Sequence, residues 1–134
     1  MERPNGKRPP TLAAVVEWAA GPDDLALNFA EFLDHLNWLV KKRAPRHRLF
    51  AAFRCEPPHC GDAAMDAYLA ATAAHLSALY GVRAPRWVDK PSRRLKRPWF
   101  AVPDAWARAW LLRDSPPAFR ERNLFTEESP LRRA

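Results

Sequence analysis

Apolar positions recur at helical spacing over most of this chain. The clearest case is residues 22–42, where five apolar side chains repeat at steps of three and four; they are Leu25, Phe29, Phe32, Leu36 and Leu39. This spacing places them on one face of an amphipathic helix. A proline and two aspartates suit its first turn, and two lysines suit its last. We therefore predict one long helix over this stretch.

A second long helix is predicted between Asp62, which can cap it, and Gly81, which can end it. Its apolar stripe consists of Met65, Leu69, Thr72, Leu76 and Leu79. His75 neighbours this stripe, so we expect a packed or boundary histidine rather than a ligand.

Shorter helices are predicted on either side of these two. Thr11 can cap a short helix that Gly21 can end, and Pro45 permits another with Leu49, Phe50 and Phe53 as its apolar side. Asp104 can cap a helix over residues 104–114, and Ser115 can cap a last short one.

Residues 82–103 lack a clean period and contain four prolines. We predict an extended connection that crosses the helices and is anchored by Trp87, Trp99 and Phe100. The fold class is therefore all-α, a single compact domain of five to six helices (residues 11–134) with a proline-rich irregular connection. Residues 1–10 are charged and proline-rich, and we expect a disordered basic arm.

Composition supports this interpretation. Hydrophobic residues make up 48% of the 134 positions, with no Ile, and 14 prolines against 4 glycines favour helices separated by rigid breaks. The chain has no run of about 18 apolar residues, so no membrane span is expected. The first ten residues do not resemble a secretory signal. The two cysteines are expected to be free thiols in a reducing compartment, so we expect a cytoplasmic protein.

The formal net charge is +7, and the cations gather in two segments, residues 41–48 and 83–97. The candidate partner-binding or nucleic-acid-binding residues are Lys41, Lys42, Arg43, Arg46, Arg48, Arg83, Arg86, Arg93, Arg94, Lys96 and Arg97. The basic side chains could pair with phosphates while the neighbouring Trp87 and Trp99 stack on bases. The alternative is that the tryptophans fill the core and the basic side chains form a solvated rim around them. Under the first interpretation, charge reversal at Arg93, Arg94, Lys96 and Arg97 weakens binding. No complete helix-turn-helix is evident.

One cluster could hold a metal: His47, Cys55, His59 and Cys60. Its spacing matches no standard zinc pattern, and adjacent His59 and Cys60 rarely bind one metal together, so a surface loop is the favoured interpretation. No third group orients a Cys–His pair for nucleophilic catalysis, and no glycine-rich phosphate loop is present. We therefore expect no cofactor and no enzyme activity.

The C-terminal half resembles a known group of proteins. "YGVRAPRWV", "RPWFAVPD" and "ARAWLLRDSPPAFRERNLFTEESPLRRA", with the helix "EPPHCGDAAMDAYLAATAAHLSALYG", are similar to uncharacterised bacterial proteins with a Ser-Pro-x-x-Phe-Arg-x-Arg-x-x-Phe ending. Many members carry a helix-turn-helix domain in front, and some are antitoxin or regulator components of toxin–antitoxin loci. The first 55 residues of this chain do not show that domain clearly.

The ending itself predicts structure. Phe119 and Phe125 are expected to fold back into the core as anchors, with Arg120 and Arg122 available outside. The resemblance implies no established enzyme activity. We expect a non-enzymatic helical protein that binds a macromolecule, as an antitoxin-like or regulatory component of a toxin–antitoxin type pair, through an apolar and arginine-rich face on a protein partner. The alternative is a nucleic-acid-binding protein that uses residues 41–48 and 83–97.

Overall fold

The computed structural model describes residues 7–101 and 105–126, and within them it is predominantly helical. The described helices are α1 (Leu12–Glu17), α2 (Pro22–Lys41), α3 (Arg46–Ala51), α4 (Ala63–Tyr80), α5 (Ala105–Asp114) and α6 (Pro117–Arg120). Two 3₁₀ turns, η1 (Arg86–Asp89) and η2 (Pro91–Arg93), and two strands, β1 (Trp99–Phe100) and β2 (Leu124–Phe125), complete the order. The predicted all-α class of five to six helices is confirmed, with six helices in the described residues.

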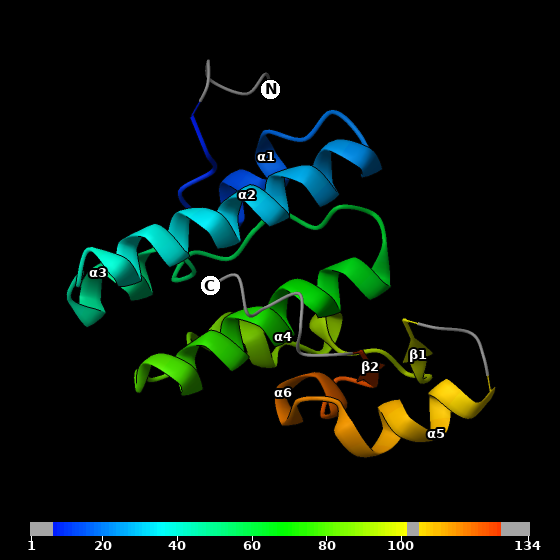
Figure 1. Cartoon of the computed structure of the whole chain (residues 1–134). Coiled ribbons are helices and arrows are strands. Elements are labelled where there is room, and N and C mark those ends of the chain that lie inside the picture. The colour runs from blue at the N-terminus through cyan, green and yellow to red at the C-terminus, as the bar shows by residue number, and fades with distance from the viewer. Residues whose placement is uncertain (1–6, 102–104, 127–134) are drawn as a thin grey trace.

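Helix α4 is the centre of the molecule. In Figure 1 it lies between an upper layer of α1, α2 and α3 and a lower layer that contains α6, β2 and α5. It packs against α3, α6, both 3₁₀ turns and β2. The predicted stripe on α4 was wrong at Leu79, which is 60% exposed, and too narrow, because Ala67, Ala70, Ala71 and Ala73 are buried as well. Small side chains on several faces let neighbours approach α4 from both layers.

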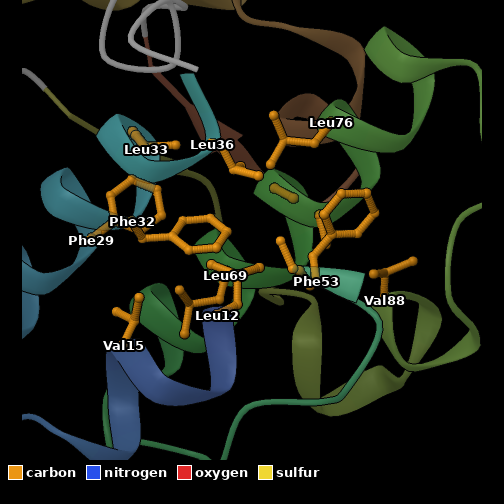
Figure 2. Packing of buried hydrophobic residues seen from close by; sticks show 14 of the residues in the cluster. Leu12, Val15, Phe29, Phe32, Leu33, Leu36, Phe53, Leu69, Leu76 and Val88 are labelled. Carbon is orange, nitrogen blue, oxygen red and sulfur yellow. The ribbon is translucent and has the colours of Figure 1, made fainter. Parts of the chain in front are cut away.

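The core joins the two layers through α4. Figure 2 shows Leu12 and Val15 of α1 and Phe29, Phe32, Leu33 and Leu36 of α2 converging on Leu69 and Leu76 of α4, with Phe53 and Val88 beside them. The predicted face of α2 is confirmed at four positions, and Leu25 is half-buried. His75 is half-buried with its ring edge-on to Phe119, as expected.

Three predicted helix ends are confirmed. Thr11 accepts a hydrogen bond from the amide of Ala14, and the carboxylate of Asp62 accepts from the amides of Ala64 and Met65. Gly81 ends α4 in the left-handed conformation, with φ of 68°. Only glycine adopts this conformation without steric cost.

Two other predicted ends were wrong. Helix α1 ends at Glu17, four residues before Gly21, which instead precedes α2. Ser115 does not cap α6: its hydroxyl donates to the carbonyl of Leu111 and accepts from the amide of Thr126. This serine therefore joins the end of α5 to the segment after β2.

The proline-rich connection is anchored, but not by all three predicted aromatic residues. Trp87 is buried and its indole N–H donates to the carbonyl of Phe53. Phe100 stacks on Phe125 across the parallel β1–β2 pair, with ring centroids 4.9 Å apart. Trp99 is 39% exposed, because neighbouring strand residues point to opposite faces. The anchoring roles predicted for Phe119 and Phe125 are confirmed, since both are buried.

Some predictions lie outside the described residues: most of the N-terminal arm (1–6), the Asp104 cap and the last eight positions. Of the described arm residues, Pro9 is buried. Among the described helices, none is both long and apolar enough to cross a membrane.

Candidate binding surfaces

Part of the predicted basic segment 83–97 is internal. Arg93 is fully buried, and its guanidinium donates to Glu56 Oε2 and to the carbonyls of Pro57 and Asp66. It also lies over the ring of Trp87, 5.2 Å from the ring centroid. The prediction that Arg93 contacts an external partner was wrong, because each of its nitrogen atoms already has an acceptor inside the fold.

Two other arginines, Arg94 and Arg122, also pair with groups of the protein itself. Arg94 donates to the carbonyl of Glu121 at 3.0 Å and pairs with Asp89 at 3.2 Å. Arg122, expected outside, is 2% exposed and donates to the carbonyls of Ala118 and Val88. Desolvation lowers the pKa of Arg122 from its ordinary value, with the positive charge of Arg94 adding to the effect. Arg120 is exposed, as predicted.

The remaining candidate cations lie on the surface. In segment 83–97 these are Arg83, Arg86, Lys96 and Arg97; in segment 41–48 all five are exposed: Lys41, Lys42, Arg43, Arg46 and Arg48. Within residues 7–101 and 105–126, none of these nine side chains has a hydrogen-bond or ion-pair partner. They are therefore able to pair with an external anion.

The cations of segment 41–48 form one end of the molecule, which we call the basic end. Helices α2 and α4 both end on this side, and α3 lies beside them (Figure 1). A methyl group on Gly81 would lie 3.8 Å from the guanidinium of Arg46, so α3 reaches the end of α4. Residues 35–55 contain no Asp or Glu. The local charge is therefore positive without any compensating acid from this stretch.

An aromatic pocket opens next to the basic end. It has a volume of about 490 Å³ and is lined by Lys7, Arg8, Pro10, Trp18, His35 and Trp38. His35 and Trp38, three residues apart on α2, stack with their centroids 6.0 Å apart and their planes 22° from parallel. Burial lowers the pKa of His35, and the charges of Arg8 and Arg48 lower it further. Both effects favour the neutral imidazole.

These aromatic residues were not predicted as site residues. Trp38 lies off the apolar face of α2 and is 45% exposed. The sequence did contain a usable indication: an aromatic residue on the polar side of an amphipathic helix, three residues after His35 and three before Lys41.

A second surface surrounds Trp99 of β1, the strand that lies far from α3 in Figure 1. A pocket of about 190 Å³ is lined by Asp62, Ala64, Met65, Tyr68 and Trp99. Exposed Lys96 and Arg97 precede the tryptophan. The next residue of the strand, Phe100, carries the guanidinium of Arg108 over its ring at 5.2 Å. We call the surface around Trp99 the Trp99 face; it combines an exposed indole with two exposed cations, Lys96 and Arg97.

The predicted metal cluster does not converge. His59 pairs with Ser92 at 3.1 Å, whereas both the amide and the thiol of Cys60 donate to Asp66. Cys55 is exposed. Within the part of the chain that the structure describes, no three His, Cys, Asp or Glu side chains are grouped to hold a metal ion.

The Cys60 thiol is also unsuited to nucleophilic attack. Burial raises its pKa, a hydrogen bond to the Asp62 carbonyl opposes this, and the carboxylate of Asp66 raises it again. A thiol held in its protonated form is a poor nucleophile.

Comparison with known proteins gives no assignment: no protein-family model, no curated protein and no solved structure shows significant similarity to this chain.

Proposed function

We propose that this protein is a non-enzymatic helical binding protein that acts on a protein partner through the Trp99 face, as an antitoxin-like or regulatory component of a two-protein pair. One observation carries the proposal: the indole of Trp99 is 39% exposed and lines a pocket, whereas the next residue of the strand, half-buried Phe100, stacks on Phe125. The exposure of this indole is expected if a partner covers it.

The composition of the Trp99 face fits a protein partner. Trp, Tyr, Met and Arg are the residue types enriched in protein interfaces, and Trp99, Tyr68, Met65 and Arg97 supply one of each. Large aromatic side chains in such places carry most of the binding energy. The exposed cations favour a partner whose apolar patch is rimmed by carboxylates, since complementary charge speeds association and excludes wrong partners.

The test follows from the two-protein setting. The chain is co-expressed with the product of the neighbouring gene, and the affinity of the purified pair is measured by isothermal titration calorimetry. We expect Trp99→Ala to weaken binding by about 30-fold or more, as truncation of a central aromatic residue costs about 2 kcal/mol or more. Trp38→Ala removes a similarly exposed indole from the opposite end and is the matched control, with no expected change in affinity.

Two outcomes would contradict the proposal. The first is no binding between the two gene products at micromolar concentrations. The second is binding that Trp99→Ala leaves unchanged while circular dichroism shows an intact fold.

A further inference from the structure

One ridge of α2 carries rings and cations in succession. His35, Trp38 and Lys41 follow each other at steps of three, which places them side by side along the helix surface. The rings of His35 and Trp38 are nearly parallel, and Trp38 is 45% exposed. The ridge therefore presents a stacked pair of rings, with an exposed indole, directly before the basic end.

The rest of the pocket lining comes from the two ends of α1. Arg8 and Pro10 precede this helix and Trp18 follows it, and all three line the pocket together with His35 and Trp38. Arg8 is exposed and has no hydrogen-bond or ion-pair partner within the described residues. The exposed indole therefore has cations near it from two parts of the chain: Arg8 in the pocket, and Lys41 and Lys42 at the end of α2.

We infer that this pocket and the basic end together bind single-stranded nucleic acid, with a base stacked on Trp38 and the neighbouring phosphates paired with Arg8 and the cations of segment 41–48. Single-strand binding requires these two components, an aromatic platform and a positive track beside it. A duplex keeps its bases stacked inside and offers no free ring face to Trp38. The inference does not depend on the proposed function, because the Trp99 face lies at the other end.

The attraction for phosphate comes from side chains alone. Helices α2 and α4 present their C-terminal ends here, and these ends carry partial negative charge. The exposed cations must outweigh this partial negative charge. They must also outweigh the carboxylate of Asp34, which precedes His35 and is the nearest acid along α2. Binding is therefore expected to be strongly salt-dependent.

The experiment uses the full chain and a fluorescent oligothymidylate of about 15 nucleotides, a length within the usual range of single-strand sites. Affinity is measured by anisotropy over a series of salt concentrations. Trp38→Ala is expected to weaken binding by about 10- to 100-fold, the range for loss of one stacked base. Trp38→Phe keeps a ring and should retain most of the affinity, and Trp99→Ala should retain all of it.

The cations are tested separately. The double variant Lys42→Glu with Arg48→Glu is expected to reduce the salt slope by about 0.7 for each phosphate that the protein no longer neutralises. The double variant Lys96→Glu with Arg97→Glu makes the same change of charge on the Trp99 face and should leave the slope unchanged.

Four results would overturn the inference. They are no binding at low salt, binding that Trp38→Ala does not weaken, equal affinity for blunt duplex, and equal competition by thymidine monophosphate or polyglutamate. The two competitors separate a strand from a free nucleotide and from an acidic protein. Failure here would leave the Trp99 proposal standing, because that proposal is tested with a different partner and a different tryptophan.

Discussion

Arg93 and half-buried Glu56, 37 positions apart in sequence, form an ion pair: Nε and Nη2 of the arginine both donate to Oε2 of the glutamate at 3.1 Å. The arginine is fully buried, and the same carboxylate also pairs with Lys90 at 2.6 Å. This arrangement fastens the 3₁₀ turns to the loop before α4. The electrostatic role of Arg93 is therefore to hold the irregular connection in place.

Removal of Arg93 is expected to be severe. Arg93→Met should lower the free energy of unfolding by about 3–5 kcal/mol, because two buried carbonyls lose their charged donor and Glu56 keeps only Lys90. Arg97→Met, on the exposed surface four residues later, should change it by less than about 0.5 kcal/mol. Urea unfolding of both variants measures the difference. Equal stability of the two would contradict the buried role of Arg93.

Arg120 and Arg122 make a second matched pair at the C-terminal end of α6. Arg122→Ala is expected to destabilise the protein by about 2–4 kcal/mol, since the carbonyls of Val88 and Ala118 lose a charged donor. Arg120→Ala removes an exposed side chain and should be nearly neutral. The check is thermal unfolding followed by circular dichroism, and a larger loss for Arg120→Ala would refute the assignment.

Gly81 provides a test of the α4 terminus. Gly81→Ala should cost about 1–2 kcal/mol, because its φ of 68° is disfavoured for residues with a Cβ atom. The cause is backbone strain rather than a clash, since the added methyl group would lie 3.8 Å from the nearest atom, on Arg46. Gly81→Asn should cost less, as asparagine tolerates this conformation. Denaturant midpoints of the two variants give the ranking, and the reverse order would count against the left-handed cap.

Helices α2 and α4 and their ends could be predicted because the relevant information is local. The spacing of Phe29, Phe32 and Leu36 and the caps at Thr11 and Asp62 involve residues within one or two turns. Ser115 was misassigned because its partner Thr126 lies 11 residues away. A serine before two prolines resembles a cap whether or not it acts as one.

The candidate surfaces were harder to predict for a related reason. Residues 83–97 contain seven cations and one aspartate, a composition typical of a solvated segment. The sequence around Arg93 does not show that Glu56, 37 residues earlier, pairs with it. The exposure of Trp38 and Trp99 also depends on which side of each element the fold covers. Charge could be placed along the chain from sequence, but its division between interior and surface required the tertiary structure.

His35 links the aromatic pocket to pH. Burial, followed by the charges of Arg8 and Arg48, lowers the pKa of His35 from its ordinary value of 6.5. As the pH falls below this value, the unfolded chain binds a proton before the folded protein does. The free energy of unfolding therefore decreases as the pH falls from 6.5 to the lowered pKa of His35 in the folded protein. Above pH 6.5 the contribution of His35 to stability is fully retained.

The His35→Gln variant should lose less stability than the wild type on the same acidification, because glutamine does not titrate. His47→Gln, at an exposed position on α3, should keep the wild-type dependence that His35 causes. The measurement is urea unfolding of all three proteins at about pH 7.5 and at a pH about one unit below the ordinary histidine value. An identical loss in the wild type and in His35→Gln would show that His35 is not held neutral against Arg8 and Arg48.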